Sequence, residues 1–214
     1  MSKRLYQSNF FDDSSPELQL DDAEIDYFAH FIEHNQALDL YQTLLNEVEW
    51  RQEVIKVYGK LHPTPRLSCW MGEAHLSYGY SHTRMEAVPW SPTLLGIKEE
   101  IQTHTEASFN SVLINYYRDG QDSNGWHSDD EPELGKNPVI ASVSLGAPRD
   151  FHLRHKNRSS MTKKSSHKMT LENGSLLMMK GTTQHYWQHH IPKRAHAQGR
   201  INLTFRTIKA LDPR

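Results

Sequence analysis

Two metal-binding residue types lie close together in the segment NGWHSDDEPELG, residues 124–135. His127 and Asp129 are two positions apart, so on an extended backbone their side chains point to the same side of the chain. A third ligand could come from His189, in the segment HYWQHHIPK. Two imidazoles and one carboxylate on one face of an octahedral ion leave three positions open, an arrangement that suits non-haem Fe(II) and oxygen activation. The alternative is a solvated acidic turn, because Asp, Glu, Pro and Gly are common in turns.

A second group of polar side chains falls on one face of the segment RINLTFR, residues 200–206. The segment alternates polar with apolar residues, which is typical of a strand with two different faces. Its polar face consists of Arg200, Asn202, Thr204 and Arg206. Guanidinium groups pair with carboxylates through two hydrogen bonds, so this face would suit a dicarboxylate held inside a barrel. The alternative is a surface strand whose polar face lies in water.

A series of short strands must position these side chains. From about residue 109, β-rich runs are separated by Gly, Pro, Asn and charged turns; the runs are FNSVLINYY, PVIASVSLGA, RDFHLRH, GSLLMMK and RINLTFRTI. Such a series predicts a sandwich or a barrel. In LINYY, Asn115 and Tyr117 share one face, so they could point into the same cavity as the polar face of residues 200–206.

Two helices are predicted before these strands. Apolar residues recur at helical spacing in NQALDLYQTLLNEVEW, residues 35–50. A second helix begins at SPTLLGIKEEI, where Ser91 can cap it and Pro92 suits its first position. We therefore expect a mixed α/β (α+β) protein whose N-terminal helices pack on one side of the strands. Residues 1–35 are expected to form an acidic N-terminal arm, and residues 36–214 a single domain.

Composition excludes several classes of protein. The chain has 214 residues, and its single cysteine, Cys69, excludes an internal disulfide framework and a zinc site built from several cysteines. The formal net charge is −2, so the chain lacks the overall basic charge of many nucleic-acid binders. The charge is uneven, because residues 1–35 carry two Lys or Arg against eight Asp or Glu. The absence of a long apolar run or a secretory segment predicts a soluble, intracellular protein without membrane partners.

Several motifs together resemble the AlkB family of iron- and 2-oxoglutarate-dependent nucleic-acid dealkylases. They are VLINYYRDGQDSNGWHSDDEPELG, PVIASVSLGAPRDFHLRHK, GSLLMMKG, WQHHIPK and RINLTFRTI, with PRLSCWMG and LSYGYS upstream. The resemblance extends from about residue 57 to residue 208 and is greatest to the second and third human AlkB homologues. The combination of H-x-D, H-x-I-P and R-x-N-L-T-F-R is specific. The fold that the resemblance implies is a double-stranded β-helix, or jelly roll.

The resemblance assigns roles to both groups of polar side chains. The family's iron ligands are matched by His127, Asp129 and His189. Its 2-oxoglutarate site is matched by Asn115, Tyr117, Arg200, Asn202 and Arg206. Arg200 would pair with the far carboxylate of this cofactor, and Arg206 would lie near its keto-acid end.

Three further residues match the substrate side of the family's site. Tyr80 corresponds to the aromatic residue that stacks on the base, with Tyr78 as a companion, although both could instead pack in the core or at the rim. Glu131 matches the acidic residue near the exocyclic amine of the base. A carboxylate there would favour cationic 1-methyladenine or 3-methylcytosine over a neutral base. The base must be extruded from a duplex or supplied in a single strand.

The implied activity is oxidative demethylation of N-alkylated bases in DNA repair. Hydroxylation of an N-methyl group releases formaldehyde and restores the base, while 2-oxoglutarate becomes succinate and carbon dioxide. The expected partners are molecular oxygen and alkylated DNA, with RNA left open, and we expect a monomer. The compartment would be the cytoplasm in a bacterium, and the nucleus or the cytoplasm in a eukaryote.

Two alternatives remain, together with one unassigned segment. The same chemistry could act on an RNA or tRNA base or on a protein methyl group, and a catalytically silent jelly-roll binding module is the third hypothesis. The segment KNRSSMTKKSSH, residues 156–167, is interpreted as a mobile basic loop. Its cations could contact phosphates, or the loop could simply be disordered at the surface; they are Lys156, Arg158, Lys163 and Lys164. The preferred strand type and the range of lesions are left open.

Overall fold

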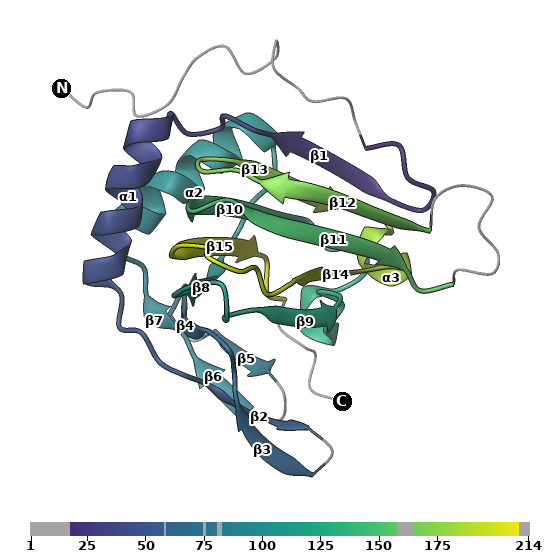
Figure 1. Ribbon diagram of the computed structural model, residues 1–214, viewed down its shortest axis with the longest axis horizontal. Helices are drawn as coiled ribbons and strands as arrows, with labels where there is room; N and C mark the ends of the chain where they lie inside the picture. The colour runs from purple at the N-terminus through teal and green to yellow at the C-terminus, as the bar shows by residue number, and fades with distance from the viewer. Residues whose placement is uncertain (1–17, 58, 75, 81–82, 158–164, 210–214) are drawn as a thin grey trace.

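A seven-stranded sheet forms the centre of the protein. The computed structural model describes residues 18–57, 59–74, 76–80, 83–157 and 165–209 (Figure 1). Strand order in this larger sheet is β1-β13-β10-β15-β8-β4-β7, and only the pair β4 and β7 is parallel. The strands are β1 (Glu24–Phe28), β4 (Leu67–Gly72), β7 (Val88–Pro89), β8 (Ser111–Tyr117), β10 (Ile140–Gly146), β13 (Leu176–Lys180) and β15 (Arg200–Arg206).

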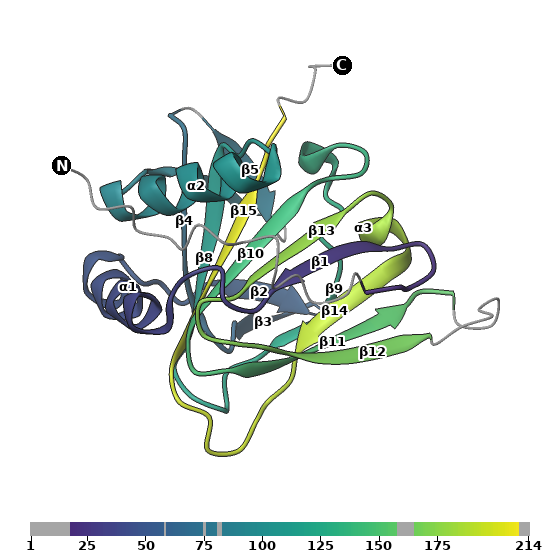
Figure 2. The same ribbon diagram turned by 90° about the horizontal axis from the view of Figure 1, so that it is seen from above.

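A smaller, four-stranded antiparallel sheet covers one face of the larger one. Its order is β12-β11-β14-β9. The strands are β9 (Asn124–His127), β11 (Arg149–His155), β12 (Ser166–Leu171) and β14 (Trp187–Ile191). Seen from above, the larger sheet lies between this sheet and the helices (Figure 2). Two facing sheets of this kind form the predicted double-stranded β-helix, or jelly roll.

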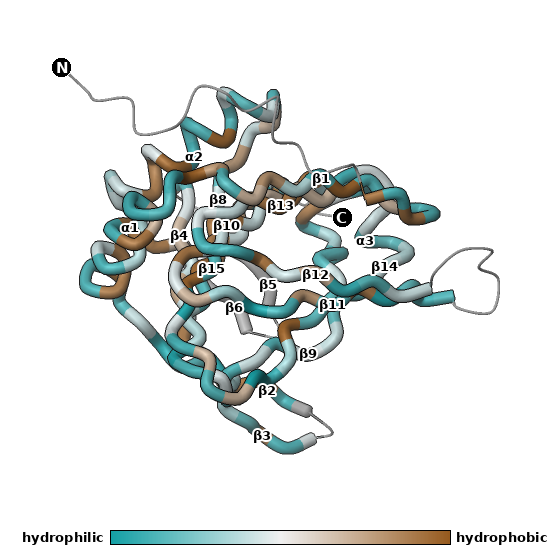
Figure 3. The backbone as a smooth tube through the Cα atoms, turned by 45° about the horizontal axis from the view of Figure 1, so that its top comes forward, coloured by the Kyte–Doolittle hydropathy of each residue, from teal (hydrophilic) through white to brown (hydrophobic). Residues whose placement is uncertain are grey.

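The helices pack on the outer face of the larger sheet, as predicted. They are α1 (His34–Glu47) and α2 (Pro92–Thr105), and the short α3 (Thr183–Tyr186) lies elsewhere, between β13 and β14. Ser91 caps α2, because its Oγ accepts a hydrogen bond from the Leu94 amide at 3.3 Å. Leu44 of α1 and Ile97 of α2 are 0% exposed and belong to the same apolar cluster as Val143 of β10. Apolar segments accordingly gather where α1 and α2 meet the sheet (Figure 3).

Strand β15 shows how one sequence pattern serves two faces. Ile201, Leu203 and Phe205 are 0% exposed and join the apolar cluster on the helix side. The alternate polar side chains point toward the smaller sheet, yet all seven residues of the strand are buried. The interpretation of β15 as a surface strand with its polar face in water is therefore wrong. Asn202 is opposite Asn115 in the register with β8, so both strands supply polar groups to one interior space.

Two hairpins lie outside the main sheets (Figure 1). They consist of β2 (Val54–Val57) with β3 (Lys60–Pro63), and of β5 (Ser77–Tyr80) with β6 (Thr83–Glu86). A 3₁₀ turn, Pro132–Leu134, follows β9. Runs of four residues carry too weak a period for alternation alone to predict either hairpin.

Part of the N-terminal region packs against the larger sheet. Glu24–Phe28 form β1, which pairs with β13 at the edge of the larger sheet. Ile25 is 0% exposed, so burial of this side chain holds the segment against the body. Residues 1–17, and 158–164 of the expected basic loop, lie outside the described residues. No helix within the described ranges is long and apolar enough to cross a membrane.

Candidate metal and cofactor site

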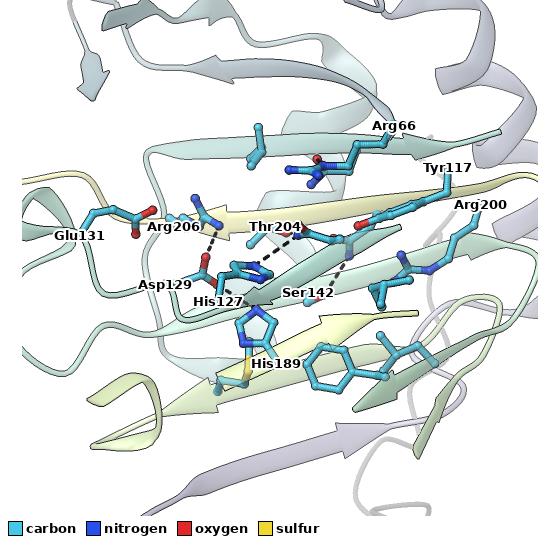
Figure 4. A pocket seen from close by; sticks show the side chains of 18 residues that line it. Arg66, Tyr117, His127, Asp129, Glu131, Ser142, His189, Arg200, Thr204 and Arg206 are labelled. Atoms are coloured by element: carbon cyan, nitrogen blue, oxygen red, sulfur yellow. Dashed lines mark hydrogen bonds and ion pairs between the residues drawn. The ribbon is translucent and has the colours of Figure 1, made fainter. Parts of the chain in front are cut away.

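A pocket opens between the two sheets on the polar face of β15. Its volume is about 580 Å³, which includes its open mouth. The lining residues are Arg66, Leu113, Asn115, Tyr117, Asn124, His127, Asp129, Glu131, Ser142, Phe151, Leu171, Met179, His189, Ile191, Arg200, Asn202, Thr204 and Arg206 (Figure 4). All of the predicted iron and 2-oxoglutarate residues are in this set, so the fold brings both groups into one cavity.

The smaller sheet and the loop after it bring the three candidate metal ligands together. His127 of β9 and His189 of β14 are register partners, so both imidazoles enter the pocket from the same face, with ring centroids 4.2 Å apart. Asp129 follows β9 by two residues, and its Oδ2 lies 3.8 Å from His189 Nε2. One ligand atom from each of the three residues lies within 4.8 Å of the others. Within the described ranges this is the one His, Cys, Asp or Glu group of three that could hold a metal ion.

Hydrogen bonds orient the ligands of this cluster from behind. His127 Nδ1 lies 2.8 Å from the carbonyl oxygen of Gly125, which can only accept a hydrogen bond. The Nδ1 atom must therefore carry a proton, so Nε2, which lies 3.3 Å from Asn124 Nδ2, is the ring nitrogen that could bind a metal. Gln184 of α3 accepts a bond from the Asp129 amide at 2.9 Å, and this glutamine is 1% exposed. The loop that carries Asp129 is thus held from inside the protein.

The electrostatics of the cluster suit metal binding. Burial, together with the neighbouring His127, lowers the pKa of His189 to about 3, so this imidazole is neutral at pH 7. Burial would raise the pKa of Asp129, but Arg206 and the two histidines hold it below its ordinary value. Asp129 is 2% exposed and forms an ion pair with Arg206 Nη2, so the solvated-turn interpretation does not apply to it. A neutral imidazole at His189 and an anionic carboxylate at Asp129 are the protonation states that metal binding requires of these two groups.

The opposite end of the pocket holds a buried cation that the protein does not neutralise. Arg200 is 1% exposed, and its Nη2 donates to Ser144 Oγ at 2.9 Å. Its Nε and Nη1 atoms are buried without a hydrogen-bond partner, and no carboxylate in the described ranges forms an ion pair with it. Burial lowers its pKa to about 10. A ligand carboxylate would supply the missing charge and both acceptors, so these residues fit 2-oxoglutarate.

Neutral polar side chains line the pocket between its two ends. Asn202 Nδ2 donates to Ser142 Oγ at 2.8 Å, and Asn202 Oδ1 accepts from Thr204 Oγ1 at 3.0 Å. Arg66 Nε donates to Asn115 Oδ1 at 2.8 Å. Sequence reasoning missed Arg66, which comes one residue before β4. The signal that could have found it is the buried run LSCWMG, because an arginine at the start of an interior strand must be paired.

The predicted substrate residues differ in how far the structure describes them. Glu131 lines the pocket on the side of Asp129 and Arg206 (Figure 4), and its Oε2 atom is buried without a hydrogen-bond partner. Tyr78 and Tyr80 belong to β5, whose backbone pairs with β6, but their side chains lie outside the described part. The cations of the basic loop are outside it as well, with the exception of Lys156. This lysine donates to Asp130 Oδ2 and to the Gln184 carbonyl, both at 3.0 Å.

Comparisons with known proteins agree with this geometry. The model of the 2OG-Fe(II) oxygenase superfamily matches residues 24–206. "Alpha-ketoglutarate-dependent dioxygenase alkB homolog 3" of Mus musculus is 44% identical over 193 residues, which are 87% of this chain and 66% of that protein. "DNA oxidative demethylase ALKBH2" of Homo sapiens is 41% identical over 180 residues, 81% of this chain and 69% of that protein. The chain therefore spans slightly less than two thirds of the first relative's length.

A solved structure shares the fold. The structure of OsALKBH1 superimposes with a TM-score of 0.58 at 17% identity, covering 86% of this chain and 96% of that one. At this identity the likeness concerns the arrangement of the sheets and helices alone. It agrees with the jelly-roll core described above.

Proposed function

Because the chain belongs to the AlkB family of the 2OG-Fe(II) oxygenase superfamily, we propose that it is an Fe(II)- and 2-oxoglutarate-dependent dioxygenase that demethylates N-alkylated bases of nucleic acids. One observation carries the proposal. A buried cluster of two histidines and one aspartate shares a pocket with Arg200, a buried guanidinium that has no anionic partner among the described residues. A metal site and a carboxylate site in one cavity are what this chemistry needs.

The residues that would hold iron are His127, Asp129 and His189. When bound, Fe(II) supplies, with 2-oxoglutarate and molecular oxygen, the oxidising power that hydroxylates a methyl group, and the cofactor leaves as succinate and carbon dioxide. The protein keeps the ligands in place before the metal arrives. Arg206 holds Asp129 in its anionic form, and the Gly125 carbonyl fixes the tautomer of His127.

The residues that would hold 2-oxoglutarate come from β8 and β15. Arg200 would bind its far carboxylate, beside the Tyr117 ring, whose centroid is 5.3 Å from Arg200 Cζ. Asn115 and Asn202, at opposed register positions, place amide groups along the same wall of the pocket. Their burial excludes bulk water, so each charged contact is stronger than it would be at the surface.

Glu131 supports a cationic base as the substrate. Its buried Oε2 atom has no hydrogen-bond partner among the described residues, and it faces the pocket on the metal side. A base such as 1-methyladenine or 3-methylcytosine carries a positive charge and an exocyclic amine, so it would supply both the charge and the donor. Hydroxylation of its N-methyl group gives an unstable hemiaminal, which loses formaldehyde and restores the base.

An RNA or tRNA base would suit the same residues, because base and carboxylate chemistry is shared by DNA and RNA. A methylated lysine would also offer Glu131 a positive charge and an N–H donor, but the relative "DNA oxidative demethylase ALKBH2" is named for an activity on DNA, which favours a nucleic-acid base. The expected monomer, the intracellular compartment and the division into an arm and a domain stay predictions. Light scattering after size-exclusion chromatography would test the first of these.

The test is a panel of short DNA and RNA oligonucleotides, single- and double-stranded, that carry one 1-methyladenine or 3-methylcytosine. We expect mass spectrometry to show loss of the methyl group, with formation of succinate that depends on Fe(II). The matched controls omit 2-oxoglutarate or use the Asp129→Ala variant. If succinate forms in the complete mixture but no oligonucleotide loses its methyl group, the substrate class is wrong. If no succinate forms under any condition, a catalytically silent binding module is the better interpretation.

A further inference from the structure

A second buried arginine lies behind the 2-oxo acid end of the pocket. Arg149, the first residue of β11, is 0% exposed but does not line the cavity. Its Nη1 donates to the carbonyl of Asp119 at 3.2 Å, and its Nη2 donates to the carbonyls of Asp122 at 2.8 Å and Pro192 at 2.6 Å. All three acceptors are neutral. No ion pair between this guanidinium and a carboxylate exists in the described ranges.

Arg149 and Arg200 share one aromatic ring. The Cζ atom of Arg149 lies 5.5 Å from the centroid of the Tyr117 ring, and that of Arg200 lies 5.3 Å from it. Both distances are within the range of cation–π attraction, which is stronger for desolvated groups. Tyr117 is 1% exposed and lines the pocket, so the ring stands between the protein interior and the cofactor site. Both guanidinium groups therefore lie against the same ring.

We propose that Arg149 is a positioning and specificity-determining residue of the 2-oxo acid site. It holds the Tyr117 ring against the pocket, and it adds a second buried positive charge at the end where Arg200 would bind a carboxylate. The proposal rests on the proposed use of 2-oxoglutarate. Neither guanidinium forms an ion pair among the described residues, and only the more distant attraction of Asp122 and Asp150 acts on Arg149, so an added anion would stabilise this end of the pocket.

The charge of Arg149 favours a dianion over a monoanion with the same chain. Two unit charges about 10 Å apart in a partly buried site, with an effective dielectric constant of about 20, change an affinity roughly tenfold. The effect acts on a far carboxylate, because the near end of the cofactor would lie at the metal. A ligand that lacks the far carboxylate should therefore not sense Arg149.

A purely structural role is the competing explanation. The three carbonyl acceptors belong to the turn after β8 and to the residue that follows β14, so Arg149 also joins these segments. Loss of those bonds alone would loosen the pocket and weaken every 2-oxo acid alike. The two explanations differ in ligand selectivity and not in the overall loss of affinity.

The experiment compares 2-oxoglutarate with 2-oxovalerate, which carries a methyl group in place of the far carboxylate. Both are titrated by calorimetry into the Mn(II)-loaded full chain, without a turnover assay. We expect Arg149→Met to weaken 2-oxoglutarate binding about tenfold and to change 2-oxovalerate binding less than about twofold. The control is Arg194→Met, since Arg194 is a nearby arginine whose side chain is 45% exposed and pairs with Asp150 at 3.4 Å. This control should leave both affinities unchanged.

A charge-retaining variant keeps the test decisive if the methionine variant does not fold. Arg149→Lys keeps the positive charge, so it should preserve the preference for 2-oxoglutarate over 2-oxovalerate within about threefold. This holds even if the loss of the hydrogen bonds to the three carbonyl groups lowers the Tm of the variant. Loss of the preference in a folded lysine variant would overturn the charge role. An equal weakening of both ligands by Arg149→Met would overturn it too and leave a structural role. A wild-type protein without preference for 2-oxoglutarate would instead contradict the proposed function.

Discussion

The two ends of the pocket carry charge in opposite ways. At the metal end, Asp129 is paired with Arg206 inside the protein, so its negative charge is compensated before any ion binds. At the other end, Arg200 is equally buried, but no carboxylate in the described ranges pairs with it. The end whose buried charges are paired keeps its shape without a ligand. The end with the unpaired Arg200 charge is stabilised only when an anion binds to it. Substitutions that break the Asp129–Arg206 pair should therefore lower the stability of the fold, whereas substitution of Arg200 should mainly lower the affinity for 2-oxoglutarate.

The largest effect is expected at the compensated end. Asp129→Ala removes the proposed anionic metal ligand and separates the buried Arg206 guanidinium from its carboxylate partner. We expect no measurable turnover, greatly weakened Mn(II) binding and a loss of about 3–5 kcal/mol in unfolding free energy. Denaturant unfolding and Mn(II) titration measure the two losses. Asp130→Ala is the matched control, because Asp130 pairs with Lys156 at the surface and should cost less than about 1 kcal/mol. Retained demethylation by purified Asp129→Ala would remove the metal assignment.

The uncompensated end should give the reverse result. Arg200→Met keeps the approximate volume but removes the buried charge, so we expect an unchanged or slightly raised Tm. The dissociation constant of 2-oxoglutarate should rise about 100-fold, because the variant cannot form two charge-assisted hydrogen bonds. Arg206→Met sharpens the comparison, since it should lower the Tm by stranding Asp129. If Arg200→Met destabilises the protein as much as Arg206→Met does, the two ends do not differ as described.

Glu131 and Tyr80 extend the comparison to the substrate. Glu131→Gln keeps the shape and removes the charge, so kcat/KM should fall about tenfold for cationic 1-methyladenine and much less for neutral 3-methylthymine. Tyr80→Ala should weaken both lesions together, by about 1–3 kcal/mol if the ring stacks on the base. Steady-state kinetics on two oligonucleotides, one with the cationic lesion and one with the neutral lesion, distinguish a loss that depends on charge from a loss that affects both lesions. An equal loss for both lesions in Glu131→Gln would place this carboxylate outside the base site.

The basic loop is expected to act outside the pocket. Exchanging Lys156, Arg158, Lys163 and Lys164 for glutamine should reduce the salt dependence of oligonucleotide binding, by about 0.7–0.9 in slope for each phosphate that the loop no longer neutralises. Lys156 is already bonded to Asp130, so it should contribute less than the other three. Fluorescence anisotropy over a range of salt concentrations measures the slope. An unaltered slope would mean that nucleic acid binds elsewhere.

The smallest effect concerns the ion pair behind the uncompensated end. Burial would raise the pKa of Asp122, but hydrogen bonds from the Arg118 side chain and amide hold it below its ordinary value. A depressed carboxyl pKa contributes stability above its unfolded value, and this contribution is lost as the pH falls through the folded value. Asp122→Asn should therefore cost about 1 kcal/mol at pH 7, because Arg118 is partly exposed. The difference in unfolding free energy between wild type and Asp122→Asn should shrink below about pH 4. Urea unfolding at several pH values measures this difference. A difference that stays constant with pH would mean that the pKa of Asp122 is not lowered.

Local sequence pattern determined which side of each element a residue occupies. The two-residue period of RINLTFR separated Arg200 and Asn202 from Ile201, and the structure keeps that separation. Ser91 followed by Pro92 determined where α2 begins. The H-x-D spacing kept Asp129 close to His127, although β9 ends at His127 and Asp129 lies in the loop after it. These features depend on neighbours in the chain, so periodicity and capping chemistry are sufficient to predict them.

Only the tertiary structure decided what lies opposite each face. Periodicity left open whether the polar face of β15 meets water or protein, and the closure of the smaller sheet over it buries that face. The same closure brings together residues that are far apart in the chain. Arg206 pairs with Asp129, 77 positions away. Arg66 bonds to Asn115, and Arg149 lies against the Tyr117 ring. Likewise, β1 joins the sheet because the edge of β13 is available to it. Such contacts join residues far apart in the chain, and a repeat of two or 3.6 residues contains no information about the surface that will cover it.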